Sequence, residues 1–405
     1  MLQVKKGYML AAFPLFYLLL VSRASLDPVL NFTKVGGIGV GAVLNLALVF
    51  IFFLLFIKRQ DVPKVFFVPW IVFSAVTVLS SFWSPDLVNS LRSSFWILTY
   101  MSAFFIPFYF SEPRRCYESV LYLVILSFAI PLAVGLLEIA TNLSAIASGE
   151  HRIKSTFSHA NILAFYLTQV LFAVLAVRAM ALKERWNIFG SYVGLAMIGL
   201  VCIMVIFTQT RSAWGVMLIL IGTHCLVNER RLILPMVLCG LMLAAFPPVT
   251  ERILDSLSSA ETYYDPYAQL NSFEWRLVVW KSAMPWIADN VWLGYGFNSF
   301  GHYFLDFVQL EEDSSFDAHN MYVQYLFDMG LVGLISYLAL AFVSIYFLVI
   351  GRQRHVTGTL VLVCFVSYSI CGITDNISFY LSFNWYFWLV IGAYLSFVYR
   401  EVVER

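Results

Sequence analysis

The sequence predicts an all-α polytopic membrane protein, with about 12 transmembrane helices and one large extracytoplasmic loop that contains short helices. Of its 405 residues, 61% are hydrophobic and only 12% are charged, about half the charged fraction of a typical soluble domain. Apolar runs of about 20 residues, each able to cross about 30 Å of hydrocarbon, recur along the whole chain. No stretch between them is long enough for a separate soluble domain, so residues 1–405 are predicted to form a single membrane domain.

Apolar runs alternating with charged turns give the limits of the spans. The first run follows Lys5 and Lys6, as in a signal peptide, but no small-x-small cleavage site follows it, so it is interpreted as a retained span. The predicted spans are 8–22, 36–57, 65–83, 92–110, 119–140, 161–181, 189–208, 212–228, 232–248, 331–350, 357–373 and 384–399.

The distribution of Lys and Arg among the turns gives the orientation. With the N-terminus placed in the cytoplasm, 16 of the 25 cations fall on the cytoplasmic side, and every inner turn carries at least two. Both termini are therefore predicted to be cytoplasmic. The longest loop, residues 249–330 between the predicted spans 9 and 10, is predicted to be extracytoplasmic. The cations on the outer side are Arg23, Lys34, Arg92, Arg152, Lys154, Arg211, Arg252, Arg276 and Lys281.

Outer cations that lie beside apolar runs need a physical reason. Arg211 lies between two predicted spans with almost no loop, flanked by Thr210 and Ser212. An arginine at membrane depth costs roughly 2.5–3.5 kcal/mol, and such a residue is usually paired or faces a polar cavity. Snorkelling of the side chain to the interface is the alternative, and it stays open for Arg23 and Arg92.

Several classes of site find no support in the composition. The net charge is +1 and no basic cluster alternates with aromatic residues in a solvated segment, so nucleic acid is not an expected partner. The six cysteines lie in apolar runs or short turns on the predicted cytoplasmic side, which disfavours disulfides and cysteine-type zinc sites. The outer carboxylates form no Asp-x-Asp pair and no Walker pattern occurs, so no metal or cofactor is expected.

Polar side chains gather in the outer segment 149–161, directly before the sixth predicted span. This segment offers the cations Arg152 and Lys154 and the histidines His151 and His159 at the membrane surface. Both histidines have an ordinary structural role as the alternative to a functional one.

The long outer loop supplies the other candidates. Residues 274–288, which include Arg276, have the amphipathic rhythm and the tryptophans of an interfacial helix. His319 follows in a polar stretch before a new apolar run, and its unperturbed pKa near neutrality suits general base catalysis. The alternative is that Asp317 or Asn320 caps a helix there and His319 has no chemical role.

This mixture of groups suits transfer from a lipid-linked phosphate donor, because nucleotide sugars and ATP are absent outside the cytoplasm. A hydroxyl nucleophile, a histidine base and arginines on a pyrophosphate leaving group make a metal-free group transfer possible. Arginine suits this role better than lysine because its planar fork binds two phosphate oxygens at once.

Five motifs follow one another over about residues 150–345. They are Phe157-Ser158-His159-Ala160-Asn161, Thr210-Arg211-Ser212-Ala213, Arg276-x-x-x-Trp280, Gly294-Tyr295-Gly296 with Ser299-Phe300, and His319-Asn320 with the glycine-rich stretch Gly330 to Leu334. In this order they resemble the O-antigen ligase and polysaccharide polymerase superfamily of bacterial envelopes.

The resemblance implies a glycosyltransferase of the bacterial inner membrane, with its active site on the periplasmic face. Such enzymes move a glycan from an undecaprenyl-pyrophosphate carrier to an acceptor hydroxyl without nucleotide or metal. By this resemblance, Arg211 and Arg276 bind the pyrophosphate and His319 activates the acceptor. Further candidate contacts to donor or acceptor are Arg152, Lys154, His159 and Asn320.

The motifs leave the acceptor open. The residues around Gly294 and His319 look most similar to those of exopolysaccharide and O-antigen polymerases, which favours the joining of repeat units. A ligase that attaches the glycan to lipid A–core is the alternative on the same site. A twelve-span transporter or flippase is the alternative of another class. Against it, the long loop lies outside after the ninth predicted span, the two halves show no repeat, and few charges lie inside spans.

Overall fold

The computed structural model describes residues 16–26, 34–35, 38–58, 62–147, 151–184, 188–190, 192–244, 249–250, 272–308 and 317–403. This part of the chain is helical except for turns and two strands of two residues each, β1 (Lys34–Val35) and β2 (Ile38–Gly39). The strands pair antiparallel, with Lys34 opposite Gly39. The predicted all-α class is confirmed.

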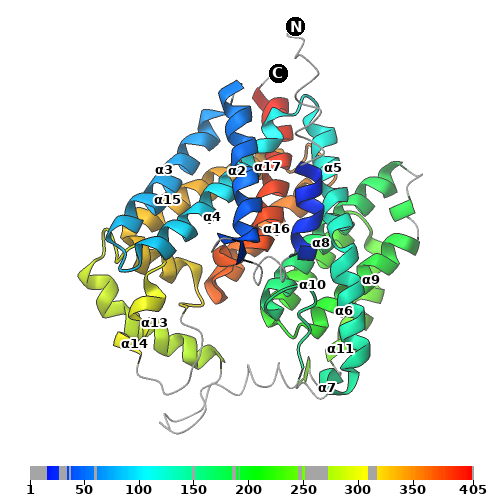
Figure 1. The fold of residues 1–405 in the computed structure, drawn as a ribbon. Helices are drawn as coiled ribbons and strands as arrows, with labels where there is room; N and C mark the ends of the chain where they lie inside the picture. The colour runs from blue at the N-terminus through cyan, green and yellow to red at the C-terminus, as the bar shows by residue number, and fades with distance from the viewer. Residues whose placement is uncertain are drawn as a thin grey trace.

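The helices alternate with short turns along the chain (Figure 1). The first half contains a helix Phe16–Leu26, α2 (Val40–Lys58), α3 (Lys64–Ser80), η1 (Ser81–Trp83), α4 (Leu87–Phe105), η2 (Ile106–Tyr109), α5 (Pro113–Ser127), α6 (Ala129–Thr141), α7 (Leu143–Ala147), α8 (Ala160–Glu184), η3 (Ile188–Gly190) and α9 (Tyr192–Phe207). The second half contains α10 (Arg211–Val227), η4 (Arg230–Leu232), α11 (Ile233–Ala244), α13 (Ser272–Asp289), α14 (Phe300–Phe307), α15 (Met321–Gly351), α16 (Gly358–Thr374), η6 (Ile377–Phe379) and α17 (Leu381–Val403).

Each predicted span overlaps a described helix, and the protein is a multi-pass membrane protein. Within the described residues, 6 helices are long and apolar enough to cross a membrane. They are Gly41–Lys58, Lys64–Trp83, Pro113–Thr141, Ala160–Lys183, Met321–Gly351 and Leu381–Val402, with shorter apolar helices at Phe16–Leu26, Tyr192–Phe207, Arg211–Val227 and Gly358–Thr374. The count of about twelve spans stays a prediction, since parts of four predicted spans, residues 8–15, 36–37, 191 and 245–248, lie outside the described residues.

Helices α8 and α17 form the centre of the bundle, since 89% and 94% of the residues in their apolar stretches are buried. Helices α4 and α5 pack on α17, whereas α9 and α10 pack on α8. The core between them is rich in aromatic rings, such as Trp70 edge-on to Trp388 at 4.8 Å between centroids. Leu381–Val402 has the lowest mean hydropathy of the six long helices, 1.4, whereas Gly41–Lys58, with 2.4, is only 22% buried. Hydropathy alone therefore does not predict which helices form the centre.

Turns assigned to the cytoplasmic side by their charges meet at one end of the bundle. There Arg400 donates to the carbonyl of Phe108 at 2.9 Å, and the hydroxyls of Tyr117 and Thr357 lie 2.8 Å apart. The C-terminal end of α17 lies at this end, and α13 and α14 lie at the opposite end (Figure 1). Which end faces the cytoplasm stays a prediction.

The same charge-rich end contains a buried ion pair that the turn assignment did not anticipate. Arg178 is only 1% exposed and donates from Nε and Nη2 to both carboxylate oxygens of Glu229, at 2.8 and 2.9 Å. Burial raises the pKa of Glu229, but hydrogen bonds and charge from Arg178 and Arg231 outweigh burial and hold it below its ordinary value. The pair fastens α8 to the turn between α10 and α11.

At the opposite end, α13, α14 and the first turns of α15 form a small core of their own. Its buried apolar side chains are Val279, Ala283, Ile287, Phe300, Phe304, Val308, Ala318 and Phe327. Helix α15 continues past this core into the bundle, with non-helical backbone angles at Gly330. The predicted span 331–350 begins at this break, ten residues after the helix itself begins. The limits 249–330 of the loop stay a prediction, because residues 251–271 and 309–316 lie outside the described residues.

Candidate active site

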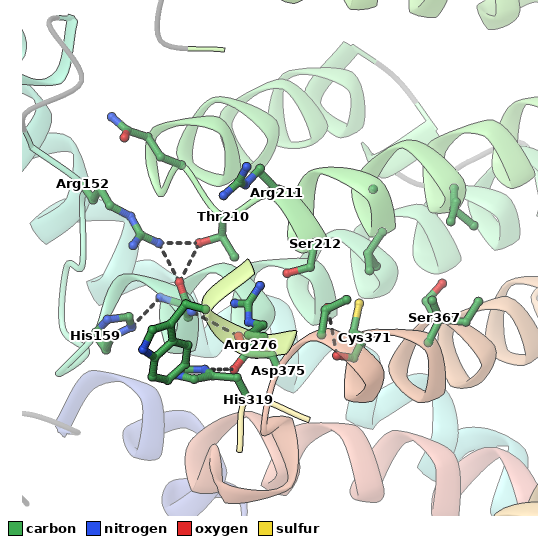
Figure 2. A pocket seen from close by; sticks show the side chains of 18 residues that line it. Arg152, His159, Thr210, Arg211, Ser212, Arg276, His319, Ser367, Cys371 and Asp375 are labelled. Atoms are coloured by element: carbon green, nitrogen blue, oxygen red, sulfur yellow. Dashed lines mark hydrogen bonds and ion pairs between the residues drawn. The ribbon is translucent and has the colours of Figure 1, made fainter. Parts of the chain in front are cut away.

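A cavity of about 610 Å³ lies where the turns before α8 and α10 meet the start of α13, the segment before α15 and the end of α16 (Figure 2). Three arginines and one carboxylate give its wall a positive balance. Its lining residues are Arg152, His159, Asn161, Gln209, Thr210, Arg211, Ser212, Gly215, Val216, Ile219, Trp275, Arg276, His319, Ser367, Ile370, Cys371, Thr374 and Asp375.

Arg152 is held in place by three acceptors on two turns. Its Nε donates to the carbonyl of Thr208 at 2.8 Å, and its Nη2 donates to Asn161 Oδ1 at 2.6 Å and to Thr210 Oγ1 at 3.0 Å. These bonds join the turn before α8 to the turn before α10. Arg152 therefore shapes the wall of the cavity and adds charge to it.

The loop that carries Arg152 is anchored on Glu138 of α6. The Glu138 carboxylate accepts from the backbone N–H groups of Lys154 and Ser155, at 3.2 and 2.7 Å, and lies 2.9 Å from His151 Nε2. Ser155 has a positive φ of 49°, so these bonds hold a strained turn. His151 therefore has a structural role in this anchor, which was the alternative to a functional role in the sequence analysis.

Arg211 and Arg276 give the cavity its capacity for anions. Arg211 is the first residue of α10, where the N–H groups and the dipole of the helix also attract negative charge. Burial lowers the pKa of Arg276, and the charge of Arg211 lowers it further, while Asp375 opposes both. Arg276 Nε is buried without a hydrogen-bond partner among the described residues. An anion between the two guanidinium groups would relieve both the repulsion and the unsatisfied donor.

His319 and Asp375 come together at the floor of the cavity. His319 Nδ1 lies 3.7 Å from Asp375 Oδ1, an electrostatic contact longer than a hydrogen bond. Asp375 is 3% exposed, and its oxygens accept from Tyr380 Oη at 2.8 Å and from Asn161 Nδ2 at 3.1 Å. The edge of the Trp275 ring faces the imidazole at 5.3 Å between centroids.

The surroundings of Asp375 keep it ionised. Burial alone would raise the pKa of this carboxyl, but the interactions with His319 and Tyr380 and the charge of Arg276 outweigh burial, so the pKa lies below its ordinary value. The imidazole of His319 therefore faces a fixed negative charge on its Nδ1 side.

His159 is the second histidine of the cavity. Burial and then the charge of Arg152 lower its pKa, which makes the ring neutral at pH 7. In agreement, its Nδ1 accepts from the backbone N–H of Asn161 at 3.1 Å.

Of the seven residues singled out from the sequence, Arg152, His159, Arg211, Arg276 and His319 line this one cavity. The other two do not. Lys154 is exposed, and its backbone N–H donates to Glu138. Asn320 caps α15, accepting on its Oδ1 from the N–H groups of Tyr322 and Val323 at 2.9 and 3.1 Å, as its alternative role required.

Asp375 is the main site residue that sequence reasoning missed. It follows directly after the predicted span 357–373, next to Asn376. The charge sorting considered only cations, so a carboxylate at the outer end of a span was not examined. Its position beside an apolar run is the available signal, but a weak one, because the charge rule that makes outer cations unusual does not apply to carboxylates.

Comparison with known proteins finds a similarity over the part of the chain that carries most of these residues. Residues 195–338 match the family described as O-antigen ligase, a stretch that runs from α9 into α15 and includes Arg211, Arg276 and His319. A search of the curated proteins found no match. Over this segment, about a third of the chain, the protein is therefore similar to the O-antigen ligase family.

Proposed function

We propose that this protein transfers a glycan from an undecaprenyl-pyrophosphate carrier to an acceptor sugar hydroxyl, and that it does so to polymerise polysaccharide repeat units. The observation that carries the proposal is the convergence of Arg211, Arg276, His319 and Asp375 on one cavity at the end of the apolar bundle. The proposed side of the reaction is the periplasmic face of the bacterial inner membrane, with both termini in the cytoplasm.

In this proposal the arginines hold the pyrophosphate. Arg276 contributes a partly exposed guanidinium whose buried Nε has no hydrogen-bond partner among the described residues, and Arg211 adds its charge at the N-terminus of α10. Charge-assisted bonds from arginine forks are the strong ones for phosphate. They stabilise the leaving group most when its bond breaks and its charge grows.

The groups for acceptor activation lie beside the arginines. With its Nδ1 toward the ionised Asp375, His319 leaves Nε2 to accept a proton, as in other carboxylate-oriented histidine bases. The acceptor oxygen forms a bond to the anomeric carbon of the donor while the bond from that carbon to the pyrophosphate oxygen breaks. The proton goes to His319, and the electron pair leaves with undecaprenyl pyrophosphate. The arginines supply the positive charge, so the proposed step requires no metal or nucleotide.

The remainder of the cavity suits the lipid part of the donor. From Arg211 it continues along one face of α10 past Gly215 and Ile219, against Ile370 and Ser367 of α16. Both helices are apolar. A polyprenyl chain fits this stripe, since its pyrophosphate end lies at the polar wall and its tail follows the helices into the hydrocarbon.

A ligase that transfers the glycan to lipid A–core is the second candidate, because the matched family is described as O-antigen ligase. Both activities use the same donor and differ in the acceptor. The alternative of a transporter is less well supported, since the matched family is described as a ligase.

Analysis of lipid-linked glycans in a deletion strain separates the candidates. Loss of a polymerase leaves single repeat units on undecaprenyl pyrophosphate, whereas loss of a ligase leaves long chains on the same carrier. Accumulation of long chains would contradict polymerisation and support ligation. An unchanged pool would contradict both.

A further inference from the structure

Gln324 lies beneath the candidate catalytic pair, in the first turn of α15. It is 1% exposed and does not line the cavity. Its amide contacts the segment before α15 that carries His319 and the turn after α16 that carries Asp375. It also contacts Asp328 of α15, which in turn binds the turn before α14.

The carbonyl oxygen of Gln324 joins the first two segments. It accepts from the backbone N–H of Ala318 at 3.2 Å and from Asn376 Nδ2 at 3.2 Å. Ala318 directly precedes His319, and Asn376 directly follows Asp375 and donates from its own N–H to Asp375 Oδ1 at 2.9 Å. One acceptor atom therefore bridges the neighbours of both members of the pair.

The amide nitrogen of Gln324 fixes the orientation of this bridge. It donates to Asp328 Oδ2 at 2.9 Å. The same carboxylate accepts from the backbone N–H groups of Asn298, Ser299 and Phe300, at 2.8, 3.0 and 3.0 Å. The backbone N–H of Ala318 can only donate a hydrogen bond. The oxygen of Gln324 must therefore face Ala318, which places its nitrogen toward Asp328.

The segment that carries His319 needs such support. His319 has a positive φ of 46°, a conformation that costs energy for a residue other than glycine and persists only where its surroundings enforce it. On the other side of this segment, Trp280 Nε1 donates to the carbonyl of Ala318 at 2.7 Å. Ala318 is thus held at both its N–H and its carbonyl oxygen, directly before the strained residue.

We propose that Gln324 is a positioning residue, which sets the distance between His319 and Asp375 by bridging Ala318 and Asn376 under the control of Asp328. This inference rests on the proposed function for its effect on catalysis, but its structural part does not. Gln324 touches no reacting atom. It acts through the placement of the imidazole against the carboxylate.

The test replaces the amide by an apolar side chain of similar size, Gln324→Met. Gln169→Met is the matched control, because Gln169 is also buried in the bundle and, within the described part of the chain, its amide forms hydrogen bonds only with Cys364 Sγ. With an undecaprenyl-pyrophosphate-linked repeat unit as substrate, kcat of Q324M should fall on the order of 100-fold, as expected for a displaced catalytic group, with KM changed less than threefold. The control should keep kcat within threefold of wild type. A kcat of Q324M within threefold of wild type would overturn the inference.

A rescue pair separates hydrogen bonding from packing. In the double variant Q324E/D328N, the new carboxylate accepts from Ala318 and Asn376. The amide that D328N introduces can donate to it and still accept from Ser299 and Phe300, so that only the bond from Asn298 is lost. This variant should regain at least tenfold of the kcat that Q324M loses. No recovery, with the double variant folded, would count against the bridge.

Hydrogen–deuterium exchange tests the bridge without any substrate. The peptide that contains Ala318 should exchange at least tenfold faster in Q324M than in wild type and remain unchanged in Q169M. Equal exchange rates would overturn the positioning role. If H319A and R211A keep full activity while exchange accelerates in Q324M, the proposed function fails and the bridge stands. If they are inactive and Q324M matches wild type in both assays, only the bridge fails.

Discussion

At the scale of single residues, Arg211 and Arg276 are distant in sequence yet interact electrostatically in one cavity. Charge sorting found both, because cations on the outer side of a membrane are costly and must be retained for a reason. The same sorting could not find Asp375. The value of that carboxylate depends on His319 and Asn161, which only the folded chain brings near it.

Replacing Arg276 tests the proposed pyrophosphate contact. Arg276→Lys keeps the charge but loses the planar fork, and we expect kcat/KM to fall roughly tenfold, whereas Arg276→Ala should lose on the order of 100-fold. Initial rates with a lipid-linked repeat unit measure this. Arg92→Ala is the matched control, since Arg92 is an exposed cation on the predicted outer side. An equal loss in R92A would show that general positive charge, not this contact, matters.

Replacing Asp375 by Asn tests the orientation of His319. The amide keeps the shape of the side chain but removes the negative charge beside the imidazole, so kcat should fall on the order of 100-fold. The pKa of Asp375 lies below its ordinary value in the folded protein, so the wild-type carboxylate is ionised throughout pH 6 to 9. Initial rates with a lipid-linked repeat unit at pH 7.5 measure this loss. A D375N rate within threefold of wild type would contradict an orienting role for Asp375.

The lowered pKa of Asp375 also determines how this carboxylate contributes to the stability of the protein as the pH changes. A depressed pKa contributes stability that is present above the pKa of the unfolded chain, about 3.9, and that is lost as the pH falls through the folded value. The melting temperatures of wild type and D375N should converge only in that acidic window.

At the scale of elements, every span predicted from hydropathy overlaps a described helix. Hydropathy did not predict where α15 begins. The helix starts at Met321, capped by Asn320, and the apolar pattern becomes continuous only after Gly330. Gly330 has φ 61°, and a Cβ there would collide with the carbonyl group of Trp292. A single-residue break of this kind leaves no periodic signal, because the helices on both sides remain apolar.

Helix α10 offers a test of the lipid stripe. Gly215 lines the cavity and has open space where a side chain would begin. Gly215→Leu should therefore occupy the stripe and raise KM for a donor with a long polyprenyl chain at least tenfold, with a smaller effect on a short-chain donor. Gly222→Leu, also with open space but off the cavity, should leave both KM values unchanged. Equal KM values in G215L and wild type would exclude this face of α10 from lipid binding.

At the scale of the whole molecule, the charge pattern predicted which turns share an end of the bundle. The turn carrying Arg114 and Arg115 lies close to Phe108, whose carbonyl contacts Arg400, and Tyr117 of α5 contacts Thr357 beyond Arg354. The pattern holds because each turn must return to one side of the bilayer. It says nothing about pairs such as Arg178 and Glu229, since burial of a turn residue depends on packing between helices.

Cysteine labelling tests the orientation of these ends. A cysteine introduced at the exposed Asp289 should react with a membrane-impermeant maleimide from the periplasmic side, and one at the exposed Arg354 should react only after permeabilisation. The unsubstituted protein gives the background from the native cysteines. The reverse pattern would place the cavity on the cytoplasmic face and contradict the proposed reaction.

The central claim is that the cavity transfers glycan from a pyrophosphate carrier, and reconstitution tests it directly. Purified protein in liposomes with an undecaprenyl-pyrophosphate-linked repeat unit as its only substrate should release undecaprenyl pyrophosphate and form longer lipid-linked glycans. Both products should disappear in R211A, R276A and H319A and persist in R92A. Chain growth that persists in all three cavity variants would contradict the claim.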